Sequence, residues 1–402
     1  MARHAKRISQ GNAAVEHLSA GILALCFPME EVARIIRQCK REALRRRELP
    51  PEVMVFYVIA LSLFPDVSYQ GVLRWILSGL QWLGNEGITI CVKSSLSDAR
   101  KRLGVEPFRK LYEEMAKPFA SQRLKGSYWK GFHLVAMDGS TLALQDTKEN
   151  AARYGRPSNQ HGPGLWPLAR FVVLAEVGTH MIFRGVMGAY RDSEIILSEQ
   201  ILPALRPGML CLADRLFPGF ELWGKASAQG CALVWRAKAG LTLPPVRTLS
   251  DGSWLAHWYP NEHELRKSNK QPHLVRVVEY KLHGGNPTEP ETIYRLLTTI
   301  LDPKKASALE LAALYPQRWE IEICVKESKS ILRRGRVTLR SKLPELVEQE
   351  FWGMLLAHYA IRKTMALAAL QSQADPDTLS YQGSIEIIKV HIAGSSLPSP
   401  PQ

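Results

Sequence analysis

The chain of 402 residues is long enough for two or three domains, and its hydrophobic content of 46% supports well-buried cores. Its formal net charge of +14 favours a polyanionic partner over a neutral metabolite. The six cysteines have no zinc-ligand spacing, and the longest apolar run, residues 53–64, is too short to span a bilayer. We therefore expect a cytoplasmic protein without a structural zinc site.

The N-terminal region, residues 1–125, has the pattern of packed helices and contains 20 Lys and Arg against 12 Asp and Glu. Two short helices are predicted on either side of Gly104, over 94–103 and 106–119. This pair is compatible with a helix-turn-helix on DNA and equally with an ordinary helical hairpin that has a solvated basic face. The basic side chains expected on its surface are Arg100, Lys101, Arg102, Arg109 and Lys110.

The pattern changes near residue 130, where apolar runs typical of strands begin. Three strands in sequence, followed by helix, strand, helix and strand, predict a mixed α/β sheet with helices on its faces. Residues 240–300 have turn signals at Asp251-Gly252 and Gly284-Gly285 between β-like runs, and they are expected to form a β-rich insertion. A long amphipathic helix is predicted over 343–372, followed by a flexible tail.

Four polar residues between 315 and 329 fall on one side of a predicted helix. At about 100° per residue, Tyr315, Arg318, Glu322 and Lys329 lie in a stripe about 60° wide. This stripe borders the apolar face instead of opposing it. On this pattern alone, a salt-bridged exposed helix is the favoured interpretation, and a site in which the four residues act together is the alternative, which depends on finding partners elsewhere in the sequence. Pro316 is expected to begin or kink the helix.

Two aspartates, Asp138 and Asp214, end apolar runs that read as buried strands. Burying a carboxylate is costly, and ligands collect at strand ends in α/β sheets. Each aspartate by itself is also compatible with a cap for the following turn. Together with Glu322, they form an oxygen-only ligand set that suits Mg²⁺ or Mn²⁺, and two such ions ~4 Å apart support displacement at phosphorus. Arg318 and Lys329 are suited to clamp flanking phosphates.

The sequence resembles the insertion sequence 4 family of bacterial DDE transposases. Its signature Y-x(2)-R-x(3)-E-x(6)-K is matched in full by Tyr315, Arg318, Glu322 and Lys329. Further resemblance extends over residues 48–77, 93–104, 135–155, 174–180, 206–217 and 339–362.

The resemblance implies a ribonuclease-H-like catalytic core in which Asp138, Asp214 and Glu322 bind two Mg²⁺ or Mn²⁺ ions. The enzyme would nick DNA at the ends of its element, and the freed 3′-hydroxyl would form a hairpin and later join target DNA. It would work as a synaptic homodimer. The residues assigned to DNA contact are Tyr315, Arg318, Lys329, Lys326 and Arg215. Trp254 and Trp258 are candidates for stacking on a flipped base, although a packing role fits them better.

The expected domains are a helical DNA-binding domain over 1–125, the catalytic core over 126–239 and 301–342, the insertion over 240–300, the helix over 343–372 and the tail over 373–402. Two alternative functions remain at this point. One is a transposase derivative that binds DNA without cutting it, and the other is a ribonuclease-H-like nuclease that lacks strand transfer.

Overall fold

The computed structural model describes residue 23 and residues 25–42, 49–81, 93–159, 162–238, 240–260, 271–281 and 293–392. The chain divides into two compact units, each of which joins segments that are distant in the sequence. The first unit comprises Met1–Phe119, Leu142–Ala169 and Val325–Gln402, and the second comprises Ala120–Thr141 and Arg170–Cys324. The units therefore do not follow the sequential order of the expected domains.

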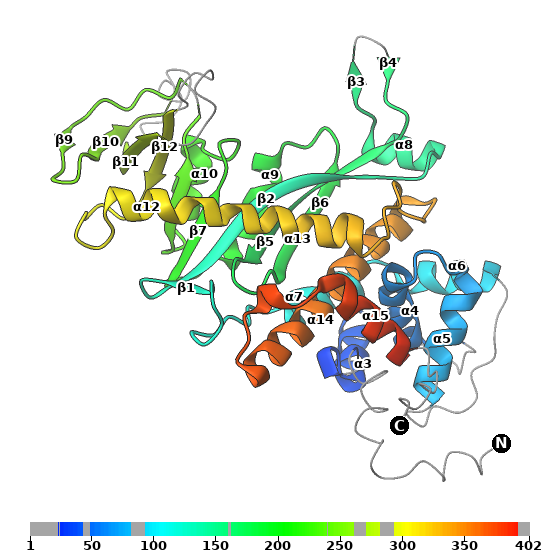
Figure 1. Cartoon of the computed structure of the whole chain (residues 1–402). Coiled ribbons are helices and arrows are strands. Elements are labelled where there is room, and N and C mark those ends of the chain that lie inside the picture. Colours follow the sequence, from blue (N-terminus) through cyan, green and yellow to red (C-terminus); the bar gives the residue numbers. More distant parts are fainter. Residues whose placement is uncertain are drawn as a thin grey trace, which may run out of the picture. The chain divides into compact units, whose positions relative to one another are not determined.

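The first unit is mainly helical (Figure 1). Helix α4, Pro51–Leu63, packs against the long helix α14, Pro344–Ser372. Residues 53–63 of α4 are all buried, as is typical of a helix that is apolar on every side. The other elements of this unit are α3 (Met29–Gln38), α5 (Tyr69–Gln81), α6 (Lys93–Leu103), α7 (Glu106–Met115), α8 (Lys148–Tyr154), the hairpin β3 (Ser158–Asn159) and β4 (Gly162–Pro163), and α15 (Tyr381–Ile392). None of the helices in the described ranges has the length and apolar character needed to cross a membrane.

The second unit is built on a mixed ten-stranded sheet, which confirms the predicted α/β class. Its strand order is β6-β5-β2-β7-β8-β12-β11-β10-β9, and β1 lies beside β2. Strand β7 pairs in parallel with β2 on one side and with β8 on the other. The strands outside the insertion are β1 (Tyr128–Trp129), β2 (Phe132–Ala143), β5 (Leu168–Glu176), β6 (Ile182–Ala189), β7 (Met209–Ala213) and β8 (Ala232–Arg236).

The insertion is β-rich, as predicted, and it continues the same sheet. Its strands are β9 (Arg247–Thr248), β10 (Trp254–Trp258), β11 (His273–Lys281) and β12 (Ile293–Thr298). Strand β12 pairs with β8 in antiparallel fashion, with Leu297 opposite Trp235. Gly252 has a φ of 82°, which agrees with the turn predicted at Asp251-Gly252. The second predicted turn, at Gly284-Gly285, lies outside the described residues.

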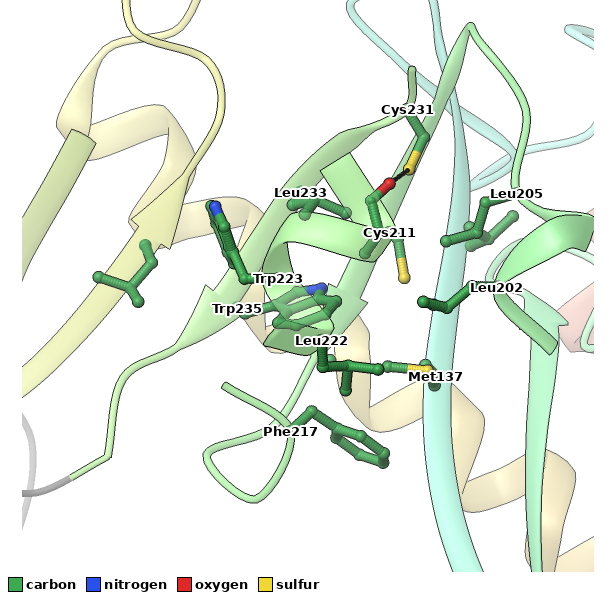
Figure 2. Close-up of a cluster of buried hydrophobic side chains, with 14 of the residues drawn as sticks. Met137, Leu202, Leu205, Cys211, Phe217, Leu222, Trp223, Cys231, Leu233 and Trp235 are labelled. Atoms are coloured by element: carbon green, nitrogen blue, oxygen red, sulfur yellow. Dashed lines mark hydrogen bonds between the residues drawn. The ribbon is translucent and has the colours of Figure 1, made fainter. Parts of the chain in front are cut away.

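A large apolar cluster holds the sheet of the second unit to α9 (Glu194–Ile201) and α10 (Phe220–Ser227). Figure 2 shows its centre, where the rings of Trp223 and Trp235 meet edge to face with centroids 5.3 Å apart. Met137 of β2 lies in the same cluster. Trp258 of the insertion is also part of the cluster and only 6% exposed, so it packs in the core. Burial of this kind stabilises a fold by about 25 cal/mol for each Å² of apolar surface removed from water.

Two expectations for the first unit are wrong. Arg100 was expected on the surface of the helix pair, but it is buried, and its guanidinium donates to Gln349, Ser341 and the Leu346 carbonyl. The tail was expected to be flexible throughout, but residues 381–392 form α15, whose Tyr381, Ile385 and Ile388 are buried. Apolar residues at helical spacing explain this burial in spite of the Ser- and Pro-rich surroundings.

The close packing of α14 on α4 gives a test of the first unit. A Cβ added at Gly353 would lie 2.9 Å from the carbonyl oxygen of Val58. We expect Gly353→Ala to lower the free energy of unfolding by about 1–3 kcal/mol, because backbone has to move to admit the methyl group. Urea unfolding followed by circular dichroism measures the change.

Gly383 of α15 is the matched control, because an added Cβ there would meet only Ser380, at 3.4 Å. Gly383→Ala should leave stability unchanged or raise it by up to ~1 kcal/mol through the better helix propensity of alanine. Equal destabilisation by the two substitutions would contradict the close approach at Gly353.

Candidate active site

Parallel pairing of β2 with β7 brings two of the predicted acids together. The last register pair between these strands joins Met137 and Ala213, and Asp138 and Asp214 follow directly. Asp138 lies inside the longer strand β2, whereas Asp214 follows the end of β7. The carboxylate of Asp138 accepts a hydrogen bond from the N–H of Gly139 at 2.9 Å, and that of Asp214 accepts one from the N–H of Leu216 at 2.8 Å.

The environment of Asp138 is strongly unfavourable to its negative charge. The pKa of Asp138 is raised from 3.8 to about 7, chiefly by burial. The charges of Asp214 and Glu322 also raise the pKa, whereas the Gly139 N–H and Arg318 lower it. Asp214, Glu322 and Arg318 are therefore all within electrostatic reach of Asp138. The three acids come from β2, from the turn after β7 and from a helical segment near residue 320.

This helical segment changes pitch along its length, although it runs on as one rod in Figure 1. It begins with α12, Ala308–Leu314, which Ser307 caps through a capping box with Glu310. A 3₁₀ stretch over Tyr315–Trp319, α13 over Glu320–Lys326 and a π-helical turn over Glu327–Ile331 follow. Pro316 lies in the 3₁₀ stretch, so it does not begin the helix, and the uniform rotation of 100° per residue assumed from the sequence does not apply.

Tyr315 and Arg318 are buried, at 5% and 6% exposure, so they do not belong to a solvated helix face. The Tyr315 hydroxyl donates to the carbonyl of Ala213, the residue before Asp214, at 3.3 Å. Burial also raises the pKa of Tyr315, which keeps the phenol protonated as a donor. Arg318 donates from Nη2 to Oε1 of Glu322 at 2.9 Å. Glu322 itself is half-exposed, with 43% of its side chain accessible.

Of the other residues assigned to DNA contact, Arg215 directly follows Asp214 and is exposed. Lys326 and Lys329 belong to the first unit. Lys326 is exposed, whereas Lys329 is half-buried, and burial together with the charge of Arg333 lowers the pKa of Lys329. A lysine with a lowered pKa still carries its charge at neutral pH unless the shift is several units.

The acidic residues fit a divalent metal ion in their chemistry. Carboxylate oxygens are the ligands that Mg²⁺ and Mn²⁺ prefer, and a raised pKa at Asp138 marks a place where added positive charge is favourable. Within the described part of the chain, however, no three carboxylate, imidazole or thiol side chains lie close enough to hold one ion together. Glu322 is hydrogen-bonded to Arg318 in this arrangement.

Sequence reasoning missed Glu194 and its partner Arg170, which lie beside this cluster. A Cβ added at Gly139 would lie 2.7 Å from the carboxylate carbon of Glu194, so the glycine next to Asp138 leaves room for Glu194. Glu194 in turn forms an ion pair with Arg170 at 2.6 Å. The only sequence signal was the Asp-Gly pair itself, which we had taken as an interruption of the strand.

In the insertion, the tryptophans singled out from the sequence are packing residues. Trp254 donates from its indole N–H to the carbonyl of Leu243 at 2.9 Å, and Trp258 lies in the apolar cluster. The half-buried aromatic pair of the insertion is instead Tyr280 and Tyr294, stacked with ring centroids 5.5 Å apart. The guanidinium of Arg236 lies 4.2 Å from the centre of the Tyr294 ring.

Two family models match the chain. The model of the insertion element 4 transposase N-terminal domain matches residues 17–113, and the model of the transposase DDE domain matches residues 129–359, more than half of the chain. The transposase InsG for insertion sequence element IS4, from Escherichia coli (strain K12), is 30% identical over 362 residues, which cover 89% of this chain and 80% of InsG. The putative transposase InsZ of the same organism is 27% identical over 218 residues, covering 54% of this chain and 71% of InsZ.

Among solved structures, a piggyBac transposase synaptic complex with hairpin DNA matches with a TM-score of 0.47 and 12% identity, covering 92% of this chain and 79% of that one. The family assignment does not depend on this match, because the sequence matches already cover most of the chain. With the family come a ribonuclease-H-like core, DNA as the partner and a general dependence on divalent metal. The chain belongs to the insertion sequence 4 family of DDE transposases, which are enzymes that cut DNA and transfer its strands.

Proposed function

We propose that Asp138, Asp214 and Glu322 hold two divalent ions, Mg²⁺ or Mn²⁺, and cut DNA at the ends of the protein's own insertion element. The observation that carries this proposal is the parallel register that places Asp138 and Asp214 side by side. The raised pKa of Asp138, to which the charges of Asp214 and Glu322 contribute, agrees with it, because a strongly perturbed acid beside further acids from separate elements is typical of catalytic sites. The matched InsG acts, by its name, for the element IS4, and this chain would serve the element that encodes it in the same way.

Bound divalent ions would supply the activation of a water or a 3′-hydroxyl and the stabilisation of the leaving oxygen. The chain's own contribution begins with Asp138, which has to lose its proton to act as a ligand. Asp214 is held beside it by its hydrogen bond to the Leu216 N–H. Glu322 has to exchange its hydrogen bond with Arg318 for the ion, and its partial exposure leaves it room to turn. The freed guanidinium would then pair with a DNA phosphate.

The proposed DNA contacts extend from this cluster along the helical segment and into the helical region. Tyr315, Arg318, Lys326, Lys329 and Arg215 would bind phosphates. Residues 1–125 would form a further DNA-binding domain, for which the exposed Lys101 and Arg102 of α6 are available. Phosphate contacts of this kind position the protein and make binding sensitive to salt.

The full reaction would be cut-and-paste transposition in the cytoplasm, carried out by a homodimer that holds two element ends. After the first nick, the 3′-hydroxyl would attack to release the element and later to join it to target DNA. This order requires the same acids to act on successive strands, so the loss of one acid removes every step.

The cost of ionising Asp138 gives a test that needs no DNA. Because its pKa is about 7 in the folded protein and 3.8 ordinarily, the metal-free protein loses stability as the pH rises from about 4 to 7. Asp138→Asn removes this loss, so the variant should be more stable than the parent by up to ~4 kcal/mol at pH 8 and by about 2 kcal/mol at pH 5. Urea unfolding in the presence of a chelator measures both differences.

Asp302→Asn is the control for this test, since it removes an exposed carboxylate of the same unit and leaves Asp138 in place, so its unfolding should keep the pH dependence of the parent. Adding Mg²⁺ or Mn²⁺ at pH 8 should stabilise the parent more than Asp138→Asn. A parent and an Asp138→Asn variant of equal stability at pH 8 would contradict the unfavourable environment of Asp138.

Cleavage of DNA that carries the gene's own flanking sequences tests the reaction. We expect Mg²⁺- or Mn²⁺-dependent cutting at the element ends, and a loss of at least about 100-fold in Glu322→Gln with DNA binding retained. Glu320→Gln is the matched control two residues away. Glu320 pairs with His180 at 2.9 Å and has no assigned role in catalysis, so this variant should still cut.

The same assay separates the alternative functions. Binding without cutting by both parent and variant would mean a transposase derivative that only holds DNA. Cutting at the ends without any joining to a target duplex would mean a nuclease that lacks strand transfer.

A further inference from the structure

The first unit contains a cavity of about 440 Å³, within the size class of small-molecule and nucleotide sites. It lies among α4, α5, α6 and the start of α14, away from the three acids in the sequence and in a different unit from them. Its lining runs from the buried Tyr57 and Arg100 to the half-buried Arg340 and the exposed Lys342. The remaining lining residues are Tyr69, Leu96, Ser97, Ser341, Leu343 and Leu346.

Three cations face this cavity, and none of them has a carboxylate oxygen within 4.0 Å among the described residues. Arg100 is only 3% exposed. Its Nε donates to Gln349 at 3.1 Å, and its Nη2 donates to Ser341 at 3.2 Å and to the Leu346 carbonyl at 2.8 Å. Its Nη1 makes no hydrogen bond to any residue in the described ranges, and it is not one of the buried polar atoms that lack a partner, so it is accessible. A guanidinium with an accessible donor and no ion-pair partner is well suited to bind an anion.

The carboxylate of Glu350 is within electrostatic reach of Arg100, but it is hydrogen-bonded to other groups. Glu350 is buried, and its two oxygens accept hydrogen bonds from the backbone N–H groups of Arg340 at 2.8 Å and Ser341 at 2.9 Å. The guanidinium of Arg340 donates to the carbonyls of Phe64 and Val67. The lining itself contains three cations and no carboxylate, so the cavity is positively charged.

Apart from Ser97 and Ser341, the rest of the lining is aromatic and aliphatic. Arg340 lies over the ring of Tyr69, with its guanidinium carbon 4.3 Å from the ring centre. Tyr57 and the leucines supply further apolar surface. A ligand that fits both parts needs an anionic group for the cations and a flat apolar group for the rings, which is the chemistry of a nucleotide.

We propose that this cavity binds one nucleotide of DNA, with the phosphate at Arg100, Arg340 and Lys342 and the base against the tyrosine and leucine side chains. The inference rests on DNA as the partner of the proposed function, but it does not involve the acidic residues. Arg100 was expected on the basic surface of the helix pair around Gly104. In this proposal it binds the phosphate although its side chain is buried.

Calorimetric titration of the full-length protein with deoxyadenosine 5′-monophosphate tests this proposal. The titration is done at low salt with a chelator present, so that no divalent ion engages the acids. We expect the mononucleotide to bind more tightly than either inorganic phosphate or deoxyadenosine alone. Lys342→Glu should weaken it by at least about ten-fold, because a charge-assisted contact becomes repulsive, while Lys342→Arg retains binding. Lys342 is exposed, so these substitutions leave the core intact.

Lys148→Glu is the matched control, because Lys148 is an exposed lysine of the first unit that does not line the cavity and has no assigned DNA contact. It should bind the mononucleotide like the parent. For element-end DNA, Lys342→Gln should reduce the slope of log affinity against log salt by about 1. Equal mononucleotide affinity in Lys342→Glu and Lys148→Glu, or no binding by the parent, would overturn the proposal. Failure of the proposed cutting reaction is detected separately, since Glu322→Gln should keep full mononucleotide binding.

Discussion

The parallel pairing of β2 with β7 is the constraint on which the rest of the candidate site depends. The register places Asp138 and Asp214 side by side at the point where β7 ends. A slip of β7 by one residue would exchange the side chains on its two faces, both of which are buried, and would move Asp214 away from Asp138. The charge of Asp214 raises the pKa of Asp138, so the two carboxylates repel each other when both are ionised. The stability of the sheet therefore has to offset the unfavourable electrostatic free energy of the neighbouring acids when no cation is bound. Such an arrangement is typical of functional sites.

Arg318 occupies a central place in the electrostatics of this site. It lowers the pKa of Asp138 and holds Glu322 by a direct hydrogen bond, so a single guanidinium serves two acids. In the proposed complex with metal and DNA, the ions take over its role toward the acids and a phosphate takes over its hydrogen bonds. Metal and DNA would then favour each other's binding. The ions would release Arg318 from the acids so that it can bind a phosphate, and a phosphate that binds Arg318 would release the acids for the ions.

Periodicity in the sequence correctly predicted the strands, the mixed sheet, the β-rich insertion and the buried side of the segment near residue 322, where Ile321, Cys324, Val325 and Leu332 are all buried. It also singled out Asp138, Asp214 and Glu322, the last two of which act on the pKa of Asp138. A charged residue in or beside an apolar run can be recognised from the local sequence alone. It could not predict features set by tertiary contacts. Glu327, at the start of the π-helical turn, is buried against Arg362 and His358 of α14, a partnership that local spacing does not encode. Arg100 was misplaced for the same reason, since its partners lie some 240 residues away along the chain.

The way in which the insertion joins the sheet has a consequence for how this protein can vary. Strand β12 covers the open edge of β8, and Trp258, Val275, Val277 and Leu297 from the insertion complete the apolar cluster of the core. A chain that lost residues 240–300 would expose a central strand edge together with one side of that cluster, which is a template for aggregation. The insertion is therefore not a detachable module. The strands β9 to β12 have to be inherited together with the core that they seal.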